Sequence, residues 1–383
     1  MNKLIIAENM YQWFIDKNYE GHDPYQLDQK AFGIIRRFPG LKKIRRLLKP
    51  FHSLIPSALF NNIKPIFHPK ALGLIISGNS MLYNKTGESK YLKSNLKIFE
   101  MLLNIRNKNY DFYCWGHPFE WGESPRFKTN EPLICVTAPI GLWLIDFYES
   151  SNSTTVLNSI LNIKTHVLNE NKWHKFDDGS EAVYYSNRSK DLTYNGASMV
   201  ALFFLRLSKI KDDKLLLKKS EKLLKFIFNG QNNDGSWFYS HLDRLNKTKD
   251  YIDNRHTGFI LESLSLIYKI NNQYLGLKKA IDKGSFFYLN SLCDNFYPKW
   301  SIDEIYPIDI HDVAQAIITF DLIKENKKAE KLITFTVKHL SNGKDEFYFK
   351  LFRSGKVNKN VFIRWNQAWM FNAICKNINI TNE

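Results

Sequence analysis

Acidic, basic and aromatic side chains suited to catalysis gather in the stretch 111–126. It reads Asp-Phe-Tyr-Cys-Trp-Gly-His-Pro-Phe-Glu-Trp-Gly-Glu-Ser-Pro-Arg, which fits neither a helical nor a strand period, so we expect a loop. Glu120 stands between Phe119 and Trp121. A carboxyl group in such apolar surroundings either points to solvent or has a raised pKa, and a raised pKa is what a general acid requires.

Carboxylates beside aromatic side chains are typical of a carbohydrate cleft, because sugar rings pack their C–H faces on Trp and Tyr while their hydroxyls need polar partners. Cleavage of a glycosidic bond requires two carboxyl groups across the bond. Glu120 and Asp253 are the candidate pair, with Asp178 or Asp309 as substitutes. The candidate substrate-binding residues are Trp115, His117, Trp121, Arg126, Tyr185, Tyr194, Trp300 and Trp365.

Chemistry on uronate residues is an alternative that uses different side chains. A Tyr or His removes the proton beside the carboxylate, and Arg or Asn neutralises the carboxylate. The residues suited to these roles are His256, His311, Tyr194 and Arg364.

Some of these residues also have a structural explanation. Asp253 stands three residues before His256 and fits the N-cap of a helix equally well. His256 and His311 occupy equivalent places in two repeats, which favours a function for both over a lone structural histidine. Some of the tryptophans would pack in the core, and others would form a platform on which a sugar ring stacks.

Two kinds of helix alternate along the chain and would position these loops. Helices apolar nearly all round are predicted over residues 71–83, 137–148, 195–207, 256–268, 311–323 and 366–375. Amphipathic, lysine-rich helices are predicted over residues 1–19, 88–105, 154–168, 213–228, 275–292 and 325–340. The unit recurs about every 55 to 65 residues, which indicates an internal repeat.

Apolar helices belong inside and amphipathic helices outside, so the repeats predict an all-α (α/α)6 toroid with small β hairpins in its loops, such as 181–185 and 347–353. No low-complexity linker divides the chain, and we expect one toroid domain over residues 1–383. Residues 20–70 would form an irregular basic segment between the first outer and first inner helix. The loops before the inner helices should open at one end, over a central cavity.

The balance of 54 basic and 38 acidic residues gives a net charge of +16, which favours an anionic partner such as an acidic glycan or a phospholipid headgroup. Nucleic acid is not an expected partner. The segment 36–49 carries no acid and seven basic residues: Arg36, Arg37, Lys42, Lys43, Arg45, Arg46 and Lys49. Peripheral membrane contact is one interpretation of this segment. A solvated helix packed on the domain is the preferred one.

The remaining patterns exclude several classes of protein. The apolar run near the N-terminus is too short for a signal peptide, and no stretch is long enough for a transmembrane helix. The four cysteines show no CxxC spacing and suggest reduced thiols in a cytoplasmic protein, so we expect no metal site. No nucleotide- or metal-binding motif is present, and no cofactor is expected.

Several motifs together resemble a known family. The stretch 113–121, Tyr-Cys-Trp-Gly-His-Pro-Phe-Glu-Trp, resembles a signature of the polysaccharide biosynthesis family named after VpsJ. Segments 21–25, 252–258, 309–311 and 364–369 are similar to its other motifs. Glu120 stands where that family usually has Asp, and His117 and Arg255 stand where it has aromatic residues. The resemblance implies a six-hairpin glycosidase-like toroid and a role in making or trimming exopolysaccharide, capsule or O-antigen.

These observations predict a glycoside hydrolase-like enzyme of bacterial surface polysaccharide biosynthesis, acting on an oligo- or polysaccharide that is acidic or lipid-linked. Glu120 and Asp253 would be its acid and base, while His256, His311 and Arg364 would orient the sugar. A uronate lyase or C5-epimerase and a non-catalytic glycan-binding protein are the alternatives. Terpenoid cyclases share this architecture, but the chain carries only a single Gln-x-x-Asp-Gly-x-Trp segment and no DxDD motif.

Overall fold

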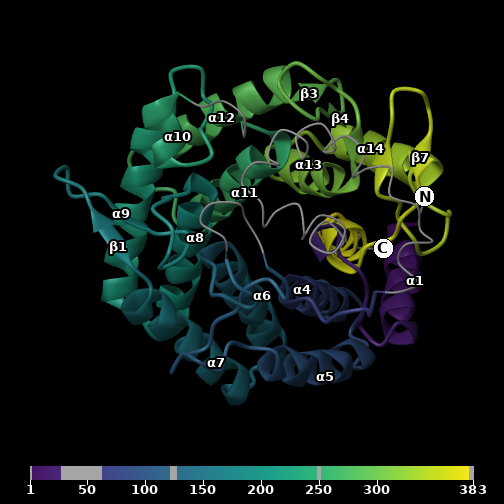
Figure 1. The fold of residues 1–383 in the computed structure, drawn as a ribbon, viewed down its shortest axis with the longest axis horizontal. Coiled ribbons are helices and arrows are strands. Elements are labelled where there is room, and N and C mark those ends of the chain that lie inside the picture. Colours follow the sequence, from purple (N-terminus) through teal and green to yellow (C-terminus); the bar gives the residue numbers. More distant parts are fainter. Residues whose placement is uncertain (1, 27–62, 121–126, 248–251, 379–383) are drawn as a thin grey trace, which may run out of the picture.

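The helices form a closed double ring (Figure 1) in the computed structural model, which describes residues 2–26, 63–120, 127–247 and 252–378. Within these residues the inner ring consists of α4 (Pro69–Thr86), α6 (Ile134–Ser151), α8 (Tyr194–Lys211), α11 (Asn254–Ile270), α13 (Ile310–Leu322) and α15 (Trp369–Lys376). The outer helices are α1 (Lys3–Asp16), α5 (Lys90–Asn104), α7 (Thr154–Thr165), α9 (Lys214–Gly230), α12 (Leu277–Ser291) and α14 (Asn326–His339). The predicted (α/α)6 toroid is confirmed.

Residue patterning explains which helices lie inside. In α13 every residue from 310 to 320 is buried, so this helix is covered on all sides. The outer helix α9 buries Leu216, Leu223 and Ile227, which share one face, and exposes Lys218 and Lys225 to solvent. Burial of the apolar face stabilises each outer helix against the inner pair beneath it.

The inner ring closes because its last member contacts its first. Each inner helix packs against the next, and α15 packs against both α13 and α4. The first outer helix, α1, also packs against α15 (Figure 1). The π-helical turn η5 (Ile363–Ala368) precedes α15 and extends it toward the loop end. Every helix of the inner ring is therefore held on two sides.

The start of α6 differs from the prediction, which began this helix at Thr137. The helix begins at Ile134, and the amide of Ile134 donates to the carbonyl of Tyr185 at 2.9 Å. The hydroxyl of Thr137 instead holds the preceding loop, because it donates to the Trp115 carbonyl at 3.0 Å and accepts from the Trp115 amide at 3.1 Å. Pro139 therefore lies inside the helix, where it removes one intrahelical hydrogen bond.

Short antiparallel strands occur in the loops, as predicted for two of them. They are β1 (Trp173–Lys175) with β2 (Glu181–Val183), β3 (Cys293–Asp294) with β4 (Tyr297–Pro298), and β5 (Ile308–Asp309) with β6 (Lys350–Leu351) and β7 (Val357–Asn358). The pairing of β5 with β6 sets Asp309 opposite Lys350 and joins the last two loops. Helix α10 (His241–Asn246), which a Ser240–Asp243 capping box begins, was not predicted. The helix predicted over residues 154–168 ends in the π-helical turn η4 (His166–Glu170).

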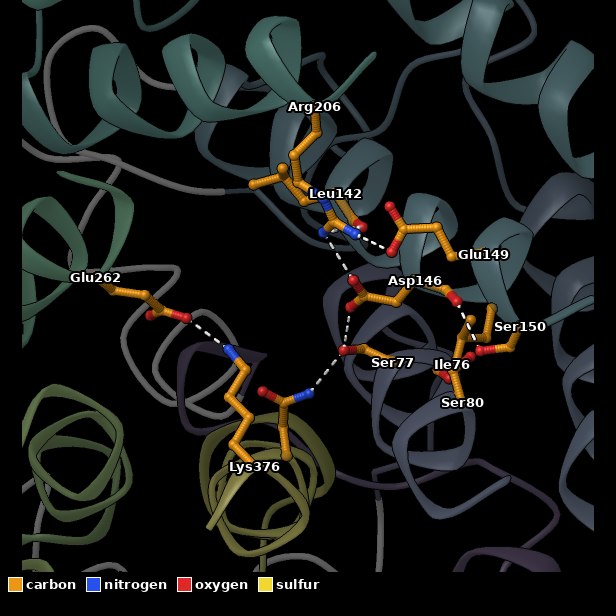
Figure 2. A network of polar contacts seen from close by, with 11 residues as sticks. Ile76, Ser77, Ser80, Leu142, Asp146, Glu149, Ser150, Arg206, Glu262 and Lys376 are labelled. Carbon is orange, nitrogen blue, oxygen red and sulfur yellow. Dashed lines mark hydrogen bonds and ion pairs between the residues drawn. The ribbon is translucent and has the colours of Figure 1, made fainter. Parts of the chain in front are cut away.

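Polar side chains connect the inner helices toward their C-terminal halves (Figure 2). Asp146 of α6 accepts from Ser77 of α4 at 2.6 Å and from Arg206 of α8 at 2.7 Å. Asn372 of α15 donates to the same Ser77 hydroxyl at 3.0 Å. A separate ion pair joins Lys376 to Glu262. These contacts connect five of the inner helices, α4, α6, α8, α11 and α15.

None of the helices in the described ranges combines the length and apolarity that a membrane span requires. The basic segment 36–49 lies outside the described residues, so the membrane-contact interpretation stays a prediction. All four cysteines are free thiols, and Cys114, Cys293 and Cys375 are buried. Burial raises the pKa of these three thiols, which disfavours their reactive thiolate form.

Candidate active site

Three inner helices begin with a side chain that caps the helix at the same end of the ring. His68 Nδ1 accepts from the Lys70 amide at 3.1 Å, Asp253 Oδ1 from the His256 amide at 2.8 Å, and Asp309 Oδ1 from the His311 amide at 2.9 Å. Each cap fixes the first turn that follows it. Lys70, Arg255 and His311 thereby occupy the same position, two residues after the cap. His311 therefore corresponds to Arg255 and not, as predicted, to His256, which lies three residues after its cap. The N-terminal ends of the inner helices form the candidate site.

Asp253 and His256 form a hydrogen-bonded pair. The second carboxylate oxygen of Asp253 lies 2.7 Å from His256 Nδ1. The pKa of Asp253 is lowered, because the attraction of His256 and the hydrogen bonds outweigh burial, so the carboxylate is ionised and only accepts. A hydrogen therefore lies on His256 Nδ1, and in the neutral form of the ring Nε2 carries the lone pair. The His256 side chain is 25% exposed, so part of the ring is accessible from outside.

His311 lies deeper, among aromatic rings. It stacks on Trp369 with 4.8 Å between ring centroids, and it meets the edge of Trp365 at 4.6 Å. Its side chain is 3% exposed, and neither ring nitrogen has a hydrogen-bond partner in the described chain. Burial, with the positive charge of Arg255 nearby, lowers the pKa of His311 well below its usual range, so the ring is neutral. A buried imidazole without partners is costly unless a ligand or water satisfies it.

Basic and acidic groups around these histidines form buried ion pairs. Arg364 donates to both carboxylate oxygens of Asp23, at 2.6 and 2.9 Å. Arg255 Nε lies 3.1 Å from Asp312, and Lys350 Nζ lies 3.4 Å from Asp309. Most of the charged side chains at the site are therefore paired with a side chain of opposite charge.

Trp365 lies between two of the basic side chains. The guanidinium carbons of Arg255 and Arg364 each lie 4.9 Å from its ring centroid. Its indole N–H donates to Asp309 Oδ1 at 2.8 Å, and its side chain is buried. Trp365 therefore holds the ion pairs in place and has little face left for a sugar.

His68 and His117 form a second histidine pair, with His68 Nε2 3.2 Å from His117 Nδ1. His68 Nδ1 already accepts a backbone hydrogen bond, so its hydrogen lies on Nε2 and is donated to His117. Burial lowers the pKa of both rings well below the usual value, which keeps both neutral. His117 also stacks on Phe119 at 5.4 Å. The aromatic loop is thus attached to the first inner helix.

The other predicted residues fall into three groups. Trp115 and Tyr194 are fully buried: the Trp115 indole donates to the Leu102 carbonyl at 2.9 Å, and Tyr194 stacks on Phe226 at 4.8 Å. Tyr185 is also buried, at 7% exposure, and its hydroxyl oxygen accepts from the Cys135 thiol at 3.2 Å. Glu120 is half-buried, and Trp300 is 37% exposed with Lys350 Nζ 4.3 Å from its ring centroid. Trp121 and Arg126 lie outside the described residues.

Three further residues that were not predicted lie at this end of the ring: Lys70, Phe259 and Trp369. Lys70 is 7% exposed and lies 5.6 Å from the Trp369 ring centroid. A lysine directly after Pro69 at the start of an otherwise apolar helix was the available signal. Phe259 and Trp369 lie within apolar helices and had no such signal.

Two surface hollows among the described residues, of about 380 and 410 Å³, are lined by other residues than the histidines of the candidate site. Among the described residues, no group of three or more His, Cys, Asp and Glu side chains is arranged to hold a metal ion. The chemistry available at the inner-helix ends is therefore that of His256, His311, Lys70 and their partners.

No family model and no curated protein matches the sequence. Solved structures do match the fold. The Lin0763 protein from Listeria innocua is 10% identical, with 98% of this chain and 96% of that one covered and a TM-score of 0.67. Cellobiose 2-epimerase from Bacillus thermoamylovorans is 12% identical over 81% of this chain and 88% of that one, with a TM-score of 0.62. The family 76 α-mannanase BT2949 from Bacteroides thetaiotaomicron is 12% identical over 83% and 87%, with a TM-score of 0.58.

Further matches include a polysaccharide lyase and glycoside hydrolases of other families. At this level of identity the matches show a shared fold, the six-hairpin glycosidase-like toroid. The resemblance to the VpsJ-named family stays an expectation from the sequence.

Proposed function

We propose that the chain is a carbohydrate-active enzyme that transfers a proton at a sugar carbon beside a carbonyl or carboxylate group, with His256 as the base. The Asp253–His256 pair is the observation that carries this proposal. The carboxylate fixes the imidazole tautomer, leaves Nε2 as the acceptor and stabilises the imidazolium that forms. The fold supports a sugar substrate, because enzymes acting on carbohydrates recur among its structural matches.

Two reactions use such a base. In epimerisation His256 Nε2 takes the proton from one face of the carbon, the electron pair moves onto the adjacent carbonyl or carboxylate, and a proton returns to the opposite face. In elimination the same electron pair expels the oxygen on the next carbon, and an unsaturated sugar results. The second acid or base for epimerisation is proposed to be His311. Its neutral ring can take the proton in one direction of the reaction, and in the other direction the ring must first be protonated before it returns a proton to the carbon.

Glycoside hydrolysis by Glu120 and Asp253 is the second candidate, supported by the glycoside hydrolases that share the fold. It would require the Asp253 carboxylate to act directly on the sugar or on water. Both oxygens of Asp253 already accept hydrogen bonds from His256, through the backbone amide and the ring. This arrangement favours a positioning role for Asp253 and therefore favours proton transfer over hydrolysis.

The biological setting that we propose is bacterial surface polysaccharide biosynthesis, on the strength of the VpsJ-type motifs alone. Two of those motifs supply the residues described above, since 252–258 contains the Asp253–His256 pair and 309–311 contains His311. The substrate would then be an oligo- or polysaccharide, or its building block.

Deuterium incorporation tests the reaction. The protein is incubated in D₂O with neutral aldoses, disaccharides, uronic acids and uronate oligosaccharides, and the products are followed by proton NMR. Loss of one carbon-bound proton signal with formation of an epimer supports epimerisation, and a new vinyl proton supports elimination. Cleavage in H₂¹⁸O with uptake of one heavy oxygen and no carbon-bound deuterium would instead establish hydrolysis.

The His256→Gln variant should lose the deuterium exchange. The control is His339→Gln, which removes an exposed histidine from the last turn of the outer helix α14. Exchange that survives in His256→Gln would refute the assignment of the base.

A further inference from the structure

Lys70 is the exception to the pairing of charges at the candidate site. Arg364, Arg255 and Lys350 each have a carboxylate partner within 3.4 Å. Lys70 is 7% exposed, and its ammonium group has no carboxylate or hydrogen-bond acceptor in the part of the chain that the structure describes. A buried cation without a counterion is unfavourable for folding, so the burial of Lys70 points to a partner beyond the described residues.

Other donors without acceptors surround the same place. The indole N–H of Trp369, whose side chain is 4% exposed, has no hydrogen-bond partner within the described chain. Both nitrogens of His311 are likewise without partners, and a neutral imidazole carries one N–H. Buried donors are almost always satisfied in native proteins, so several in one cluster point to a bound acceptor.

Two aromatic rings join these groups into one site. Lys70 Nζ lies 5.6 Å from the Trp369 ring centroid and 6.0 Å from that of Phe259. The two rings lie 5.2 Å apart, and His311 stacks on Trp369 at 4.8 Å. Apolar walls exclude water and strengthen the attraction between the ammonium group and an anion.

We propose that Lys70, with the Trp369 indole N–H and the His311 ring, forms a subsite for an anionic oxygen group on the sugar, either a carboxylate or a phosphate. The inference rests on the proposed carbohydrate function and names its substrate class. The ammonium group supplies the charge, the two ring N–H groups donate to the remaining oxygens, and Phe259 packs against the sugar ring. Water alone would satisfy the donors but would not neutralise Lys70.

The neighbouring geometry connects this subsite to the proposed base. Phe259 follows His256 by three residues on α11, and their rings lie 6.3 Å apart. Phe259 also lies 6.0 Å from His311. A sugar anchored by its anionic group at Lys70 would therefore lie along Phe259 toward His256, with the carbon next to a carboxylate nearest the anchored end.

Calorimetric titration of the whole chain with three sugars tests the subsite: D-glucuronate, D-glucose 6-phosphate and D-glucose. At pH 7 at least one anionic sugar should bind the unmodified protein about tenfold or more tightly than glucose. Preference for glucuronate indicates a carboxylate subsite, and preference for glucose 6-phosphate a phosphate subsite. The Lys70→Met variant should lose this preference, whereas Lys278→Met, an exposed lysine on the outer helix α12, should keep it.

Folding is checked in the same samples. Lys70→Met removes a buried, unpaired charge, so its thermal midpoint should be no lower than that of the unmodified protein. An unchanged preference in a folded Lys70→Met variant overturns the inference, as does equal binding of glucose and both anions. If deuterium exchange occurs on neutral sugars only, the proposed function stands and the anionic subsite is rejected. If no sugar binds or reacts, both are rejected.

Discussion

The guanidinium group of Arg364 binds both carboxylate oxygens of Asp23, at 2.6 and 2.9 Å, across a sequence separation of 341 residues. Asp23 follows α1, and Arg364 lies in η5 before α15. The ion pair therefore joins the first and last repeats at the loop end of the ring. Tyr25 and Trp365 pack on the guanidinium with 5.2 and 4.9 Å between the Arg364 guanidinium carbon and each ring centroid.

Replacing Arg364 with Met should destabilise the protein by about 3–5 kcal/mol, because Asp23 would remain buried without a partner. Urea unfolding followed by circular dichroism measures the change in free energy. Lys278→Met, which breaks an exposed pair with Asp282, should cost less than about 1 kcal/mol. The double variant Asp23→Leu with Arg364→Met should recover part of the loss. An equal loss of unfolding free energy in Arg364→Met and Lys278→Met would contradict a buried, stabilising Asp23–Arg364 pair.

Asp253→Asn should slow the proposed proton transfer about a hundredfold to ten-thousandfold while leaving the fold intact. Asn is as good an N-cap as Asp, so helix α11 should still begin at the same place. An amide can donate to His256 Nδ1 and so move the ring hydrogen to Nε2, which removes the base. The readouts are the initial rate of deuterium exchange and the tautomer of His256 by nitrogen NMR.

The control for Asp253→Asn is Asp213→Asn. Asp213 also caps a helix, accepting from the amides of Leu215 and Leu216 at 3.0 and 3.2 Å, but it has no histidine partner. Its replacement should change neither rate nor tautomer. A loss of activity in both variants would show that capping, and not the tautomer, is what matters.

Anion binding at Lys70 should weaken as the pH rises through about 8. Burial lowers the pKa of Lys70 from 10.5 to about 8, so the ammonium group loses its proton above that pH. The titratable and charged groups that act on it are His68, His117, Cys135, His311, Arg364 and Asp23. Titrations with glucuronate and glucose 6-phosphate at pH 6.5, 7.5, 8.5 and 9.5 measure the effect. A flat profile would contradict the assignment to Lys70.

Lys70 should also make the stability depend on pH in the opposite direction. Between pH 8 and 10.5 the unfolded chain holds a proton on Lys70 that the folded chain lacks. The free energy of unfolding contributed by this group therefore rises with pH across that window, and below it the full penalty of the buried charge is present. The difference in unfolding free energy between Lys70→Met and the unmodified protein should shrink from pH 7.5 to 9.5.

Gly116→Ala should displace the loop that carries His117. A β-carbon at Gly116 would lie 1.9 Å from the carbonyl oxygen of Glu131, which is backbone and cannot rotate away. We expect a loss of about 1–3 kcal/mol and a changed histidine NMR spectrum for the His68–His117 pair. Gly179→Ala, where a β-carbon meets open space at φ +82°, should cost less and leave that pair unchanged.

The fold could be predicted from the sequence because its signal is repeated. In each pair one helix is apolar nearly all round and the other is apolar on one face only. Six such pairs in succession predict a closed ring with the apolar helices inside. Boundaries were less certain: Thr137 has the chemistry of an N-cap, yet its hydroxyl is used by Trp115 in the loop. A tertiary contact overrode the local preference there.

The candidate site was only partly predictable. Asp253 and His256 are three residues apart, so a helix start is enough to bring them together. The partner of Arg364 is Asp23, at the other end of the chain, and only the closed ring brings it near. Lys70 was missed because a lysine next to a proline ordinarily indicates a solvent-exposed helix start, and its burial depends on α11 and α15.

Closure of the inner ring has a consequence for unfolding and for evolution. An open array of helical repeats needs special terminal repeats to cover its ends and can fray from them. Here α15 contacts α4, so each inner helix has two neighbours and the ring presents no such end. Loss of any one pair of helices would expose the apolar sides of the two inner helices that it had separated. The chain should therefore unfold in a single cooperative step and tolerate change in its loops far better than gain or loss of a repeat.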